Sequence, residues 1–190
     1  MLKRIPRFQL NPMLIFTISI LLMGCSSAYY GTMEKLGYHK RDLMVNRVES
    51  ARDAQQEAKE QFESALEKFS QVLKLDGGEL EEKYEQLKTA YDKSNDRAET
   101  VRDRIEAVED VSEALFEEWQ AELDQYTSDS LRRSSARKLK QTRRQYTQLI
   151  GAMKRAEKKM EPVLSAFHDQ VLFLKHNLNA RACLLYTSDA

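Results

Sequence analysis

Apolar residues recur every three or four positions along most of this chain, in three long segments separated by short polar breaks. The clearest segment spans 79–126, where the first and fourth positions of successive heptads are mostly apolar or small. The d positions are Leu80, Leu87, Ser94, Val101, Val108 and Leu115, and the a positions are Tyr84, Tyr91, Ala98, Ile105, Ser112 and Trp119. Unbroken heptads of this length predict a coiled-coil helix of roughly 70 Å at 1.5 Å per residue.

The segment before it predicts a first long helix over 41–75. Its a positions are Val48, Gln55, Phe62 and Phe69, and its d positions are Ala51, Ala58, Ala65 and Val72. Small residues at d allow a neighbouring helix to approach closely. The sequence Asp76-Gly77-Gly78 should end this helix, because glycine adopts the left-handed conformation at a helix C-terminus without steric cost.

A third helix is predicted after the polar break 127–130, which is rich in N-cap residues, and should run to about Ala180. Its a positions are Leu139, Tyr146, Met153, Met160, Phe167 and Leu174, and its d positions are Thr142, Leu149, Ala156, Val163, Gln170 and Asn177. Pro162 removes a backbone hydrogen bond and should kink this helix. Beyond it the apolar stripe broadens, which indicates contact with more than one neighbour.

Because the connections are short, consecutive helices should pack antiparallel. We therefore predict an all-α fold, an elongated antiparallel coiled-coil bundle of three long helices over 41–182. A further C-terminal helical segment is expected after Ala182 in the natural protein.

The first residues predict an export signal. Lys3, Arg4 and Arg7 precede the uncharged run Met13–Met23, which is shorter than the roughly 20 residues that span a bilayer. The sequence Leu22-Met23-Gly24-Cys25 resembles the lipobox of bacterial lipoproteins. We expect a signal peptide over 1–24 and lipid on Cys25. Ser26, rather than Asp, favours the outer membrane, facing the periplasm, over the inner one.

Residues 25–40 should form a membrane-proximal tether. Its tyrosines suit a membrane surface, and they equally suit a short helix that packs back on the bundle. Both interpretations remain open.

The last eight residues, 183–190, match what a common transposon-end sequencing adapter encodes, and we expect that they are not native. Cys25 is then the one native cysteine, which leaves no disulfide framework.

Charge is strongly segregated although the chain has a formal net charge of zero. Segment 79–129 holds 17 acidic and 6 basic residues, whereas 131–160 holds 11 basic residues and one acidic residue. One explanation is that the acidic and basic helices pair, each exposed ion pair contributing about 0–1 kcal/mol. The other is a cationic face for lipid phosphate, lipopolysaccharide or cell-wall polymer, formed by Arg132, Arg133, Arg137, Lys138, Lys140, Arg143 and Arg144.

Four stretches carry a family resemblance: SAYYGTMEKLGYHKRD, DGGELE, EALFEEWQAELDQY and PVLSAFHDQVLFLKHNLNARA. Through them the mature chain resembles an uncharacterised family of bacterial lipoproteins, domain of unknown function 2959. The resemblance implies a helical segment after Ala182, and it implies no particular activity.

No residue pattern indicates catalysis. His39, His168 and His176 form no pair spaced by three or four positions, as helical metal sites require, and no nucleophile follows a motif for a tight turn. We expect no enzyme activity, no metal and no cofactor.

Two functions remain. The first is a lipid-anchored helical scaffold, spacer or adaptor of the bacterial envelope. The alternative is a binding module that recognises anionic lipid, lipopolysaccharide or peptidoglycan through the basic third helix. Expected partners are the membrane, through the N-terminal lipid, and an envelope protein, peptidoglycan or lipopolysaccharide. Nucleic acid is not expected, because an exported lipoprotein does not meet it, and the pattern specifies no oligomeric state.

Overall fold

The described part of the chain is all-α, as predicted. The computed structural model describes residues 29–33, 39–74 and 80–188, and these contain helices and no strand. The elements are α3 (Lys40–Lys74), α4 (Leu80–Glu122), the 3-10 turn η1 (Leu123–Gln125), α5 (Asp129–Lys158) and α6 (Met160–Ser188). Residues 29–33 form a short helical turn.

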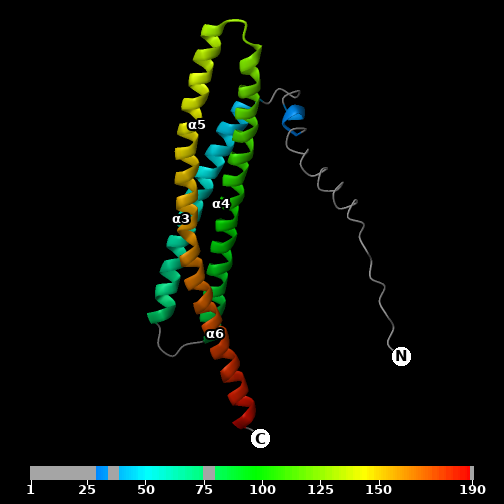
Figure 1. The fold of residues 1–190 in the computed structure, drawn as a ribbon. Coiled ribbons are helices and arrows are strands. Elements are labelled where there is room, and N and C mark those ends of the chain that lie inside the picture. The colour runs from blue at the N-terminus through cyan, green and yellow to red at the C-terminus, as the bar shows by residue number, and fades with distance from the viewer. Residues whose placement is uncertain (1–28, 34–38, 75–79, 189–190) are drawn as a thin grey trace, which may run out of the picture.

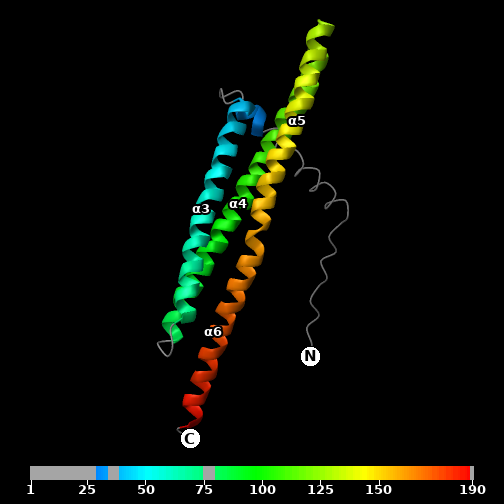
Figure 2. The same ribbon diagram turned by 90° about the vertical axis from the view of Figure 1, so that its left-hand side faces the viewer.

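The long helices pack side by side around α4 (Figure 1). The chain descends through α3, ascends through α4 and descends again through α5 and α6 (Figures 1 and 2). In both views α4 and α5 extend beyond the start of α3, so that one end of the described part of the chain consists of these two helices. We call this two-helix end the tip.

The observed helix ends follow local capping rules. Asp42 lies in the first turn of α3, where a carboxylate complements the helix dipole. Ser128 is the N-cap of α5, and its side chain accepts from the backbone N–H of Leu131 at 3.5 Å, which confirms the N-cap predicted in the polar break. The predicted glycine stop at 76–78 lies outside the described residues.

The predicted third helix is two helices, α5 and α6, which meet at Lys159. Pro162 has no N–H for the carbonyl of Lys158, and its ring collides with that carbonyl in a regular helix. The backbone N–H of Lys159 therefore bonds to the carbonyl of Ala156 at 3.2 Å in a tightened turn. The break precedes Pro162 by three residues. No glycine or proline follows Pro162 within α6, which ends at Ser188 and not near Ala180.

Small residues of α3 form its buried seam, as predicted. One core cluster joins α3 to α4 and α5 in the middle of the molecule; its buried members are Ala51, Ala54, Ala58, Val101, Ile105, Val108, Ile150 and Met153. On α4, Ser94 and Ser112 are also fully buried. Their hydroxyls donate to the carbonyls of Ala90 (2.8 Å) and Val108 (2.6 Å), so the two polar residues at these core positions carry no unsatisfied polar group.

The predicted d positions of the third segment are wrong. Its buried residues lie at the a and e positions: Leu139, Ile150, Met153, Leu164, Phe167 and Val171. Leu149 and Val163, predicted as core, are 38% and 36% exposed. The reason is that α5 and α6 pack chiefly on α4 and stand away from α3, so only one edge of the apolar stripe is covered.

The tether packs back on the bundle at Tyr30, which is 3% exposed. Its hydroxyl accepts from Nη1 of Arg47 at 2.7 Å, and the same nitrogen donates to the carbonyl of Ala107 on α4 at 2.8 Å. The Arg47 guanidinium lies 5.5 Å from the centre of the Tyr30 ring. Of the two interpretations of the tether, this contact favours the packed one. Cys25 and the predicted signal peptide lie outside the described residues.

Candidate functional site

The seven residues of the predicted cationic face lie on α5, close to the tip, and all are exposed. Arg133, Arg137, Lys140 and Arg144 follow one another at intervals of four, three and four residues. Residues so spaced lie on one face of a helix, and this set covers about 16 Å of α5 at 1.5 Å per residue. We call these four residues the basic row.

The basic row has no carboxylate partner among the residues that the structure describes. Of the seven basic residues, Arg132 pairs with Asp129 within α5 at 3.1 Å. Arg143 donates through Nη2 to the carbonyl of Phe116 at 3.2 Å, and its guanidinium lies 5.4 Å from the centre of the Phe116 ring. The other five, the basic row and Lys138, form no ion pair with a described residue. Pairing with acidic α4 therefore does not account for their charge.

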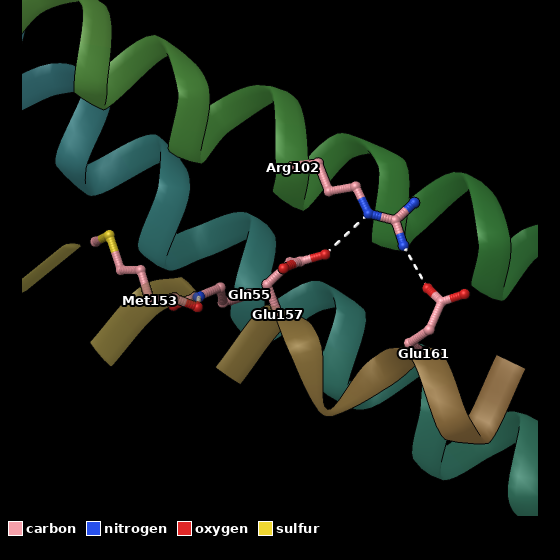
Figure 3. A network of polar contacts seen from close by, with 5 residues as sticks. All are labelled: Gln55, Arg102, Met153, Glu157 and Glu161. Atoms are coloured by element: carbon pink, nitrogen blue, oxygen red, sulfur yellow. Dashed lines mark hydrogen bonds and ion pairs between the residues drawn. The ribbon is translucent and has the colours of Figure 1, made fainter. Parts of the chain in front are cut away.

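The ion pairs that join α4 to α5 and α6 lie in the middle of the molecule instead, and Lys40 at the start of α3 pairs with Glu118 of α4 at 3.0 Å. Lys154 on α5 pairs with Glu109 on α4, and this contact raises the pKa of Lys154. Arg102 on α4 holds Glu157 of α5 at 2.9 Å and Glu161 of α6 at 2.8 Å (Figure 3). In these pairs the charges are the reverse of those expected, because the acidic helix α4 supplies the cation and the other two helices supply the carboxylates.

Aromatic contacts hold α4 and α5 together at the tip. Phe116 and Leu123 pack with Leu139, and Trp119, Ala136 and Tyr146 lie around them. The rings of Phe116 and Tyr146 meet edge to face at 5.4 Å, and Nε1 of Trp119 donates to Oγ of Ser135 at 2.8 Å. These contacts join α4 to α5 without any residue of the basic row. The side chains of the row therefore remain exposed to solvent.

A hollow of about 400 Å³ lies between α4 and α5 beside the basic row. Its lining includes Gln120, Leu123, Leu139, Lys140, Arg143 and Arg144. Three cations thus stand around an apolar floor, and this arrangement suits an oxyanion attached to an apolar group. Gln120 and Leu123 were not predicted as site residues, since they lie beyond the last predicted heptad position, Trp119.

No metal centre is found in the part of the chain that the structure describes, which holds no cluster of three or more His, Cys, Asp or Glu side chains. The ring of His168 lies 5.4 Å from that of Tyr91. Of the described helices, none is long and apolar enough to cross a membrane.

Comparison with known proteins gives one match. No curated protein and no solved structure matches the chain. A family model described as "Protein of unknown function (DUF2959)" matches residues 29–188, a range that begins within the tether and includes α3, α4, α5 and α6. The chain therefore belongs to the DUF2959 family.

Proposed function

We propose that this protein is a lipid-anchored helical scaffold of the bacterial envelope whose basic row binds phosphate groups at an anionic membrane surface. The observation that carries the proposal is the basic row itself: four cations on one face of α5, without a carboxylate partner among the described residues, although acidic α4 lies alongside. The role is not catalytic and needs no cofactor.

The strength of such binding follows from the number of cations. Each Lys or Arg close to an anionic membrane contributes about 1 kcal/mol, and the interaction decays over a Debye length of about 10 Å in 0.1 M salt. Four cations in one row therefore give binding that is appreciable at low salt and falls steeply as salt is added.

The packed tether supports a membrane ligand over a more distant one. Five positions separate Cys25 from Tyr30, a span of at most about 18 Å. Tyr30 is fixed through Arg47 to Ala107 of α4. From Ala107 to Phe116, beside Arg143, α4 rises about 14 Å. A lipid on Cys25 would thus hold the membrane within about 32 Å, measured along the molecule, of the level of Arg143.

The scaffold role rests on the length and packing of the helices. We propose that α3, α4 and the pair α5 and α6 form an antiparallel three-helix coiled-coil bundle that acts as a stiff spacer in the periplasm, anchored in the outer membrane. The lipid itself is tested by labelling cells with palmitate. Label should enter the wild-type protein and not a Cys25→Ser variant, which should leave the membrane fraction.

The basic row is tested by sedimentation of the purified protein with vesicles of phosphatidylglycerol and phosphatidylethanolamine. The test variant carries Arg133→Glu, Arg137→Glu, Lys140→Glu and Arg144→Glu. Its matched control carries the same change at Lys68, Lys93, Arg104 and Lys175, exposed cations elsewhere on the surface. Arg132 and Arg143 stay unchanged, because they make contacts within the fold.

Wild type and control should bind the anionic vesicles at low salt and lose binding as salt rises, and the test variant should not bind. Neutral phosphatidylcholine vesicles should bind none of the three. Equal binding by test variant and control would contradict the proposal. Binding to peptidoglycan sacculi without binding to vesicles would contradict it as well, and would assign the basic row to the wall polymer.

A further inference from the structure

A groove of about 600 Å³ separates α3 from the junction of α5 and α6. It lies between two direct contacts of these helices. At one end Nε2 of Gln55 donates to the carbonyl of Met153 at 3.1 Å (Figure 3). At the other end the rings of Phe69 and Phe167 stack at 5.4 Å. Both pairs of residues lie 14 positions apart, about 21 Å along a helix.

The groove is apolar along its length. Its apolar lining consists of Phe62 and Leu66 on α3, with Ala152, Ala156, Met160 and Val163 on α5 and α6. Phe62, Ala156, Met160 and Val163 occupy heptad positions that the sequence predicted as core, yet Val163 is 36% exposed, and Leu66, outside the predicted core positions, is 53% exposed. A heptad pattern forms where a helix meets another helix, and here one side of the pattern is uncovered.

The spacing along both walls suits a helix. Phe62 and Leu66 lie four residues apart, as do Ala152 and Ala156, and such rows form the ridges between which a helix packs. The two alanines leave room for close approach. The groove is long enough for about 14 residues of helix.

The charged residues at the rim of the groove indicate which side chains a bound helix would carry beside its apolar face. The cations of the rim are Lys59, Arg155 and Lys159, and its carboxylates are Glu63 and Glu157. Glu157 already binds Arg102, and Glu63 lies 3.8 Å from Lys59. Arg155 and Lys159 form no ion pair with a described residue, so the rim favours acidic side chains.

A second copy of this chain does not supply such a helix from its described residues. The acidic helix is α4, and its apolar face is covered by α3, α5 and α6. We propose that the groove between α3 and the junction of α5 and α6 receives an amphipathic helix with acidic flanks from a partner protein.

The test uses a fluorescent peptide of about two heptads with Ile and Leu at its core positions and Glu at its flanking positions. The comparison peptide has Lys in place of each Glu. Anisotropy with the purified full chain should show binding of the acidic peptide at least about tenfold tighter than binding of the basic one, because the rim is cationic.

Two pairs of variants locate the binding site. Leu66→Glu on α3 and Val163→Glu on α6 should each weaken binding of the acidic peptide at least about tenfold. The matched controls are Val45→Glu on α3 and Leu149→Glu on α5, since both are exposed aliphatic residues outside the groove. They should bind like wild type, and circular dichroism should show the same helix content in all four.

Three results would overturn the proposal. The first is equal binding of the two peptides, or binding that the groove variants leave unchanged. The second is a dimer of the chain alone in light scattering that Leu66→Glu dissociates, which would assign the groove to a second copy. The third is binding of palmitate in the groove while neither peptide binds, which would assign it to an acyl chain.

Discussion

The middle of the molecule and the tip bury the apolar faces of their helices with different side chains. In the middle, three helices share a core in which α3 contributes alanines and α4 contributes Val101, Ile105 and Val108. At the tip, within the described ranges, α4 meets α5 alone, and the contact relies on Phe116 and Trp119. Ion pairs join helices in the middle, whereas at the tip the basic row has no carboxylate partner among the described residues.

The difference shows how the number of neighbours decides which side chains a helix needs. With neighbours on two sides, a helix buries enough apolar surface through small and aliphatic residues. With one neighbour, large rings must supply the buried area, since a buried aromatic side chain removes about 150–250 Å² from water. The tip can therefore keep its cations free without losing its fold.

The largest effect should come from Phe116→Ala at the tip. Phe116 is buried and contacts α5, and a large-to-small change of this kind costs about 3–5 kcal/mol. Hydrogen exchange should show faster exchange at the tip, while the amides around Ala58 in the middle keep their protection, because the two core clusters share no buried residue. Equal loss of protection in both regions would show that they unfold as one unit.

A smaller loss is expected from Ala58→Leu in the middle. Ala58 is almost fully buried at the seam of α3 with α4, and overpacking a tight site costs about 1–3 kcal/mol. Thermal unfolding measures the loss. Ala121→Leu, at an exposed position of α4, is the matched control and should leave the midpoint unchanged. If both variants melt like wild type, the seam is looser than its geometry indicates.

Local sequence patterns predict some features of this fold and not others. The all-α class, the alanine seam of α3 and the N-cap in the polar break 127–130 follow from local pattern, whereas the helix count does not, because the predicted third helix divides into α5 and α6. The register of α5 does not, because choosing between Leu149 and Ile150 requires knowing on which side each neighbour lies. Burial of Tyr30 likewise depends on Arg47 and Ala107, which lie 17 and 77 positions away in the chain.

The candidate site was predicted in the same partial way. Exposure of the basic residues follows from their charge and position. Their lack of partners does not, because it depends on the register between α4 and α5, which brings Arg143 onto Phe116 and leaves Arg144 in solvent. The groove exists because α3 and α5 are separated from each other although both pack on α4. The separation of two helices is not encoded in a local pattern.

Arg143 and Arg144 offer a sharper comparison within the tip itself. Arg143→Gln should cost about 1 kcal/mol, because it removes a hydrogen bond to the Phe116 carbonyl and a contact with its ring. Arg144→Gln should change stability by less than about 0.5 kcal/mol, as surface substitutions usually do. Urea unfolding of both variants measures the difference. Equal stabilities would mean that the Arg143 contact contributes nothing.

The smallest effect concerns alkaline pH and Tyr146, which packs against the cores of both regions. Burial raises the pKa of Tyr146 above 10, and a hydrogen bond with Ser112 partly opposes this. The folded state therefore holds the phenolic proton more tightly than the unfolded state. Its contribution to stability is complete below about pH 10 and is lost as pH rises above that value.

Tyr146→Phe should reduce this alkaline loss. The measurement is urea unfolding at pH 8 and above pH 10, both for wild type and for the variant. Tyr30, whose pKa burial also raises, contributes a loss with the same sign, so Tyr30→Phe serves as the comparison. An identical alkaline loss in wild type and both variants would show that neither hydroxyl is responsible.

Arg102 has a mechanical consequence for α6. The backbone hydrogen-bond ladder is interrupted at Lys159, and the one guanidinium grips a carboxylate on each side of that interruption. A force pulling on the far end of α6 would consequently pass sideways into α4 through side chains, and not along a continuous helix. The stiffness of this junction therefore depends in part on one arginine, and high salt would lower it.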